Sequence, residues 1–374
     1  MMRKLKFIFS LLLFLAASFV YSFDYGFIYN SSIQTLKVDD KPFSFSGNEN
    51  LNLWSRIPLT EWASLVMDGN YNLSYDFEKL YHQVDLTSLY AEMDFQTSKD
   101  AKIGVDLGRI QFSDFSGLIY NSSLDGGKID FELSDAQIEL FSGYTGLLNG
   151  KSVRFANIYQ ENDASNVYQL APEMVITGFS TNVKNIFDNS AIACDFSTFI
   201  LSSNLEGRDT SVYAEVGIEG PLSSLLYHKV SAAMNFSAGE KNIAGFLATG
   251  NLMYYPDFLS SSLTAEVTFA TDTCQPILDT PVVFGTSNSL TGLLKFTLGG
   301  SLKPISNMVL SAGADFVMDI EGSNVAKNCV QWNGSVNYQI LSDLVFTLFV
   351  AQKIALTPAA NNLFMGSVSL VLNF

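Results

Sequence analysis

Apolar and polar residues alternate with a period of two along most of this chain. The segments 65–77, 290–302 and 331–340 show the alternation most clearly. In the first of them, Leu65 and Tyr71 share one face with other apolar residues, while the opposite face carries aspartate, asparagine and serine. Successive side chains of a β-strand point to opposite sides, so this pattern predicts strands with one apolar and one polar face.

Such segments, each about ten residues long, repeat along the chain with turn signals between them, which predicts an all-β fold. We expect eighteen strands, at 24–36, 50–58, 64–77, 83–96, 101–112, 127–134, 136–146, 173–184, 191–201, 211–220, 226–237, 242–255, 261–271, 288–302, 308–320, 330–340, 344–355 and 364–374. The pattern is weakest in the pair 127–134 and 136–146 and in the first two strands. If one such pair does not form, sixteen strands remain.

The lengths of the expected connections depend on their position. Those after even-numbered strands are short turns, such as 97–100 and 303–307. Those after odd-numbered strands are longer and polar, and they include 37–49, 113–126, 147–172, 272–287 and 321–329. Short turns at one end and long loops at the other are typical of an antiparallel up-and-down barrel, and an even strand number puts both chain ends at the short-turn end.

The last eleven residues of the chain alternate and end on an aromatic residue. One face of this segment carries Phe364, Gly366, Leu370, Leu372 and Phe374. A tilted strand needs about 9 to 11 residues to cross a bilayer. The ending resembles the C-terminal assembly signal of bacterial outer-membrane β-barrels; the alternative is an ordinary last strand of a soluble sandwich.

This resemblance implies an antiparallel up-and-down transmembrane β-barrel of about 16–18 strands, with short periplasmic turns and long outer loops. It also implies contact with outer-membrane lipid and insertion by the outer-membrane barrel machinery. The N-terminus agrees: basic Arg3, Lys4 and Lys6 precede the apolar run 7–20. We therefore expect a cleaved signal peptide at residues 1–22, export through the inner membrane, and one barrel domain at 23–374.

Composition excludes several classes of function. The formal net charge is −16, which argues against nucleic acid as a partner because that requires a basic face. The chain is 48% hydrophobic, yet no apolar stretch long enough for a helical span follows the N-terminal run. Only helices and closed barrels satisfy their backbone polar groups in lipid, so the mature chain fits a barrel.

Catalytic chemistry is not apparent in the sequence. There are two histidines, no catalytic motif, and three cysteines without metal-ligand spacing, so we expect neither an enzyme nor a metal or cofactor site. Cys274 and Cys329 would lie in neighbouring outer loops. A disulfide between them and unpaired thiols are both compatible with the sequence.

The polar faces of the cleaner strands are predominantly acidic. They carry Asp68, Asp76, Glu92, Asp94, Asp106, Glu215, Glu219, Glu266, Asp315 and Asp319. The basic residues placed there are Lys229 and Lys295. Charge of one sign around a confined pore favours ions of the other sign, so this face predicts a cation-leaning lumen. Alternatively, the carboxylates only solvate the interior or pair with loop residues such as Lys151 and Arg154.

The segment around Arg109 leads into the third outer loop, at 113–126. In porin families this loop often folds into the barrel and narrows it, and the chain here is similar to that arrangement over about twenty residues. Arg109, Asp114 and Asp125 are the constriction residues that the similarity implies. Strict alternation points Arg109 outward, so this role requires a bulge or a strand end before it. The alternative is a surface loop with turn glycines.

Together these features predict an outer-membrane porin that passes small hydrophilic solutes by passive diffusion. Two other functions stay open: a closed barrel that acts as a surface adhesin or structural protein, and a transporter of hydrophobic ligands of the fatty-acid type. A homo-oligomer is compatible with the sequence, but nothing in it marks a subunit face.

Overall fold

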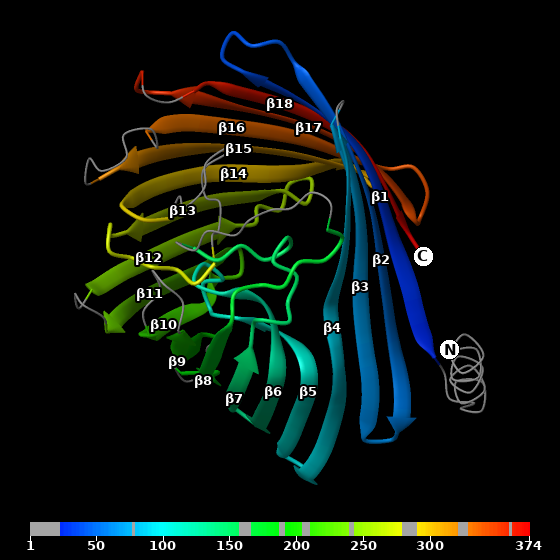
Figure 1. Cartoon of the computed structure of the whole chain (residues 1–374). Coiled ribbons are helices and arrows are strands. Elements are labelled where there is room, and N and C mark those ends of the chain that lie inside the picture. The colour runs from blue at the N-terminus through cyan, green and yellow to red at the C-terminus, as the bar shows by residue number, and fades with distance from the viewer. Residues whose placement is uncertain are drawn as a thin grey trace, which may run out of the picture.

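The structure, a computed structural model, describes residues 23–76, 79–156, 166–186, 191–203, 210–238, 243–278, 290–320, 328–358 and 361–374. They form one antiparallel sheet of eighteen strands that closes on itself (Figure 1). The strands are β1 Asp24–Val38, β2 Ser44–Thr60, β3 Ala63–Asp76, β4 Lys79–Ser98, β5 Ala101–Ser113, β6 Asn121–Leu133, β7 Ala136–Tyr144, β8 Met174–Val183, β9 Ala193–Ser203, β10 Thr210–Ser223, β11 Leu226–Ala238, β12 Ile243–Tyr254, β13 Ser262–Ala270, β14 Leu293–Ile305, β15 Met308–Asp319, β16 Cys329–Gln339, β17 Leu344–Ala355 and β18 Leu363–Asn373. No described segment is a helix long and apolar enough to span a membrane.

The barrel closes where the first strand meets the last. β1 pairs with β18 over the whole register from Ile28, opposite Asn373, to Val38, opposite Leu363. Beyond this ladder, the backbone N–H of Phe27 donates to the carbonyl of Phe374 at 2.8 Å, and the two rings stack at 5.3 Å. The terminal aromatic residue thus takes part in closure, which leaves the sheet without a free edge.

All eighteen expected strands are present, including the weakly patterned pair β6 and β7, so the sixteen-strand alternative is wrong. Several boundaries were also wrong. β2 begins at Ser44, which shortens the expected 37–49 loop, and β6 begins at Asn121, which reduces the expected 113–126 loop to 114–120. Runs of Gly, Ser and Asn resemble turns, but they extend the ladder here because polar side chains can face a wet interior. The signal peptide expected at 1–22 lies outside the described residues.

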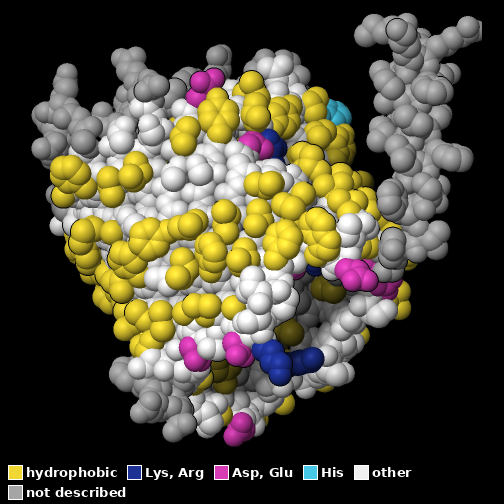
Figure 2. Space-filling view, turned by 90° about the horizontal axis from the view of Figure 1, so that it is seen from below, with side chains coloured by type: hydrophobic (Ala, Val, Ile, Leu, Met, Phe, Trp, Pro, Cys, Tyr) yellow, Lys and Arg dark blue, Asp and Glu magenta, His cyan; other side chains and the backbone are white. Residues whose placement is uncertain are grey.

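The two faces of the wall differ in chemistry. Alternate residues point outward and are apolar, for example Leu298, Met234 and Leu263, with 66%, 60% and 55% of their surface exposed. Figure 2 shows such side chains covering most of one side of the molecule. An exposed apolar wall of this extent fits lipid rather than water as the surrounding medium.

Candidate functional site: the inner wall and the loops folded against it

The inner wall carries most of the charged strand residues. All ten carboxylates predicted to line the lumen occupy inward register positions, alternating with outward apolar residues such as Val216 and Phe316. Further inward charged residues were not placed from the sequence, among them Arg56, Lys102, Lys128, Lys353, Asp130, Glu139 and Asp195. The inner face is therefore acidic in excess, but more mixed in charge than the sequence indicated.

Many of these charges are paired, within one strand or across neighbouring strands. The Lys128 ammonium lies 3.4 Å from Asp106, 3.2 Å from Asp130 and 3.5 Å from Glu139. The Lys102 ammonium lies 2.9 Å from Asp94, and these two side chains remain 34% and 40% exposed. Water therefore reaches this part of the inner wall, and solvent screening leaves such pairs with little effect on stability.

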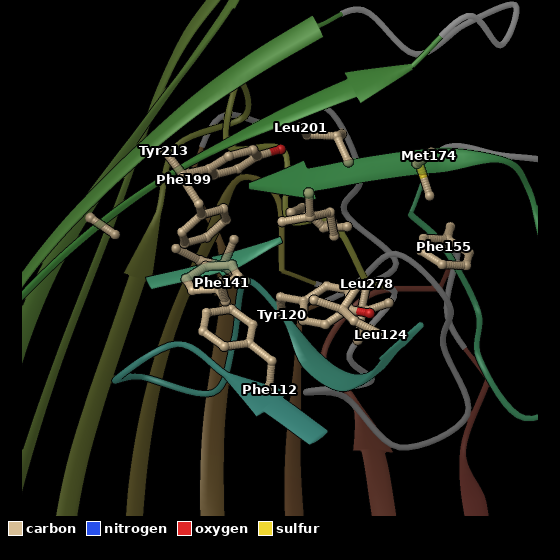
Figure 3. Close-up of a cluster of buried hydrophobic side chains, with 14 of the residues drawn as sticks. Phe112, Tyr120, Leu124, Phe141, Phe155, Met174, Phe199, Leu201, Tyr213 and Leu278 are labelled. Atoms are coloured by element: carbon tan, nitrogen blue, oxygen red, sulfur yellow. The ribbon is translucent and has the colours of Figure 1, made fainter. Parts of the chain in front are cut away.

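A second sector of the inner wall is apolar and buried. It comprises inward residues of β5, β7, β9, β10 and β12, namely Ile110, Phe112, Phe141, Phe199, Leu201, Tyr213 and Leu247. Figure 3 shows their rings packed together, with centroids 3.9 Å apart for Phe112 and Phe141 and 5.0 Å for Phe199 and Tyr213. Inward aromatic residues would be exposed in an open lumen, so something must cover them.

The cover consists of three connections that fold into the barrel. They are the connections after β5 (114–120), after β7 (145–156 and 166–173) and after β13 (271–278), and they contribute Tyr120, Leu148, Phe155 and Ile277 to the same cluster. The backbone N–H of Ile277 donates to the carbonyl of Ile119 at 2.9 Å, and the N–H of Ala156 donates to that of Ile277 at 3.0 Å. We call this packed group the inner loop body.

Asp114 organises the first of these loops from within. Its carboxylate accepts the backbone N–H groups of Gly117, Ile119 and Tyr120 at 2.8, 3.1 and 2.6 Å. The Tyr120 hydroxyl donates to the Ser123 carbonyl at 2.6 Å, and burial raises the pKa of this phenol. Asp114 is 4% exposed, so its charge serves the loop backbone.

Glu215 of β10 holds the tip of the same loop from the facing wall. Its carboxylate accepts the N–H groups of Phe115 and Ser116 at 3.1 and 3.0 Å, and Glu215 is only 2% exposed. The Phe115 ring lies against Gly217, where an added Cβ would come within 2.2 Å of it. The Lys229 ammonium lies 4.2 Å from the centre of the ring, as in a cation–π contact. We call these three wall residues, Glu215, Gly217 and Lys229, the Phe115 seat.

Arg109 occupies the point where β4 and β5 separate. The β4–β5 ladder ends at Leu89 and Arg109, after which β4 continues toward Lys79 paired only with β3. The guanidinium forms a fork with the Asp125 carboxylate, both bonds being 2.8 Å, and donates to the carbonyls of Leu86 at 2.9 Å and Leu147 at 2.7 Å. Arg109 thus ties β4, β6 and the inner loop body together at what we call the β4–β5 seam.

The expected bulge or strand end before Arg109 does not occur. β5 continues in register to Ser113, and Arg109 keeps an outward register position although it is only 7% exposed. It is buried because the connection after β7 covers it. The preceding Gly108 has a φ of 134°, which side chains rarely adopt, and a Cβ there would meet the Leu89 carbonyl at 2.2 Å.

The three predicted constriction residues therefore lie in two places. Arg109 and Asp125 are bonded to each other in the seam, whereas Asp114 lies inside the 114–120 loop. The loop does reach across to β10, through Glu215. That these residues line the narrowest passage stays a prediction.

Comparisons with known proteins match the fold but not the sequence. No protein-family model matches the chain, and no curated protein sequence does. Among solved structures, Pseudomonas aeruginosa OpdQ matches with a TM-score of 0.64 at 10% identity, over 95% of this chain and 99% of that one. P. aeruginosa OccK5 (OpdH) matches with 0.62 at 14% identity, over 94% and 98%. P. aeruginosa OccK2 (OpdF), in complex with glucuronate, matches with 0.58 at 10% identity, over 94% and 97%.

The chain has the fold of these Occ structures, a closed β-barrel of eighteen antiparallel strands. Its closed wall, its apolar outer surface and its likeness to these Occ structures over nearly their whole length agree on this point. At identities this low, the structural match establishes the fold and leaves location and function to other arguments.

The barrel contains three free cysteines, so Cys274 and Cys329 do not form the disulfide that the sequence left open. Cys274 belongs to the inner loop body and is 4% exposed, and burial raises the pKa of its thiol to about 12. The thiolate is the form that reacts with electrophiles, so two factors protect Cys274 from modification: its burial and its protonation.

A variant that retains Cys274 as its sole cysteine should therefore resist maleimide at pH 8 in the folded state. After thermal unfolding in detergent, the same thiol should react completely. Mass spectrometry of the two samples measures the difference. Fast labelling of the folded barrel would show that the inner loop body opens readily.

Sequence reasoning expected the loop after β5 to fold inward, but it missed the other two connections of the inner loop body and the Glu215 contact. A signal did exist: segments such as 196–201, FSTFIL, carry apolar residues on both faces, which a strand between lipid and water does not need. That signal indicates a covered inner face. It does not say which loop covers it.

Proposed function

We propose that this barrel is a channel for the passive diffusion of small hydrophilic solutes across the outer membrane. The observation that carries the proposal is that charged inner-wall side chains such as Asp94 and Lys102 stay solvent-exposed inside a closed wall. A barrel of 16 to 18 strands is wide enough for an aqueous lumen. The inner loop body fills one sector of that lumen and so narrows the passage.

Two further findings support this function. OccK2, which shares the fold, was solved in complex with glucuronate, a small hydrophilic solute. The residues of the packed apolar sector offer no free surface to a fatty-acid-like ligand, since Leu124 and Tyr213 are only 0% and 1% exposed. A signal peptide at 1–22 and insertion through the C-terminal strand would bring the chain to its membrane.

Reconstitution in a planar bilayer tests the proposal. The folded, purified barrel should produce stepwise conductance. If folded protein produces no conductance, the result favours the alternative function, a closed barrel that acts as a surface adhesin.

A preference for cations is expected from the acidic excess of the inner wall. A charged, confined passage concentrates counter-ions, so the reversal potential across a KCl gradient should favour K⁺ over Cl⁻. The preference should weaken from 0.1 M to 1 M salt, because the Debye length falls from about 10 Å to about 3 Å. Asp94→Asn with Glu266→Gln should reduce it. These positions probe charge better than Asp114, which holds loop amides; an anion-selective wild type would contradict the expectation.

A further inference from the structure

The wall facing away from the inner loop body carries a continuous row of uncharged polar side chains. It crosses six neighbouring strands, β16, β17, β18, β1, β2 and β3, and each member is the register partner of the next. The members are Asn337, Thr347, Ser369, Ser32, Asn48 and Ser74. All six point inward and are half-buried.

The row runs from one end of the barrel to the other. Asn337 lies two residues before the end of β16, at the short-turn end, and Ser32 lies near the middle of β1. Ser74 lies two residues before the end of β3, at the opposite end of the barrel. Barrel strands are tilted, so a row of directly opposed residues climbs along the wall as it passes around it.

A second polar row widens this feature on three of its strands, whereas on β17 and β18 the inward neighbours of the row include Val345, Phe349 and Val371. We call the two polar rows together the band. The next row places Asn30, Asn50 and Asn72 side by side on β1, β2 and β3. The amides of Asn50 and Asn70 bond reciprocally at 3.1 and 3.0 Å, which holds both side chains in the plane of the wall. Neighbouring strands lie about 4.8 Å apart, so six of them offer a surface about 24 Å long.

The chemistry of the band selects a class of solute. Every hydroxyl and amide side chain can both donate and accept a hydrogen bond, and none carries charge. An ion gains no counter-charge from such a wall, and an apolar molecule gains no hydrogen bond. A neutral polyhydroxylated molecule matches it, because each of its hydroxyl groups also donates and accepts.

We propose that this band is a binding path for neutral polyhydroxylated solutes, sugars or sugar alcohols, which pass along it from one row member to the next. The inference rests on the proposed channel function and names one solute class for it. The inner loop body fills the sector around β5–β13, which directs a solute toward the band.

The test measures how maltose reduces the ion current through single reconstituted channels. Polyethylene glycol of similar mass is the reference, because its ether oxygens accept hydrogen bonds but cannot donate them. Maltose should reduce the wild-type current at much lower concentration than the glycol. Thr347→Val with Ser369→Ala and Ser32→Ala removes three adjacent hydroxyls and should weaken maltose binding about tenfold or more.

A matched control removes the same groups from another part of the inner wall. Thr264→Val with Ser262→Ala and Ser301→Ala, on β13 and β14, makes identical exchanges at inward positions and should leave maltose binding within about twofold of wild type. If the triple variant does not fold, Thr347→Val against Thr264→Val makes the same comparison. Equal maltose binding in variant and control, or no advantage of maltose over the glycol, overturns the inference while the channel function stands. No current at all overturns the channel function itself.

Discussion

Replacing Arg109 with alanine should lower the free energy of unfolding of this barrel by about 3–5 kcal/mol, the range expected when one partner of a buried ion pair is removed. The exchange leaves the Asp125 carboxylate without its fork and the Leu86 carbonyl without the guanidinium. The Leu147 carbonyl loses the guanidinium but keeps the Tyr168 hydroxyl as a donor. The gel shift between folded and heat-unfolded barrel, followed against temperature or urea, measures the loss.

Two variants make this result specific. Arg109→Lys keeps the charge but not the planar fork, so it should recover only part of the stability. Lys102→Ala removes a cation from an exposed pair and should cost less than about 1 kcal/mol. If Arg109→Ala and Lys102→Ala were equally mild, the β4–β5 seam would not be held by the guanidinium.

The contrast between strands and loops shows how far the sequence could predict this fold. Residues two apart in a strand share a face, and lipid requires one face to be apolar, so local alternation sufficed to find all eighteen strands and the inward side of residues such as Glu215 and Asp315. The strand ends were harder. The runs at 44–49 and 121–126 contain the residues of turns, and only the partner strand decides that they pair.

The candidate site was less predictable because its contacts are not local. Glu215 was placed on the inner face, but its partners lie about a hundred residues earlier in the chain, at Phe115 and Ser116. Nothing in the strand distinguishes a carboxylate that faces water from one that holds two loop amides. The role of Gly217 could not be predicted either, because the Phe115 ring that packs against it comes from a loop about a hundred residues earlier.

Replacing Glu215 with glutamine should release the 114–120 loop from the wall and add a state of higher conductance. The carboxylate offers each of two backbone N–H groups its own oxygen, whereas an amide offers one oxygen and one NH₂ group. One loop N–H then faces a donor in a buried site, which costs about 1–3 kcal/mol. Since about 1.4 kcal/mol is tenfold in population, the released state should become about tenfold or more populated. Single-channel recording measures this as new, longer or more frequent openings above the main level.

Glu219→Gln is the matched control for this prediction. Glu219 lies four residues further along β10 on the same inward face, opposite Lys229 in register, so the two exchanges remove the same charge from the same wall. Glu219→Gln should alter ion preference slightly without adding a conductance level. Phe115→Ala removes the ring that packs against Gly217 and Lys229, and it should also release the loop, as Glu215→Gln does. Matching traces from Glu215→Gln and Glu219→Gln would mean that charge alone matters at this wall, and that the loop does not depend on Glu215 for its position.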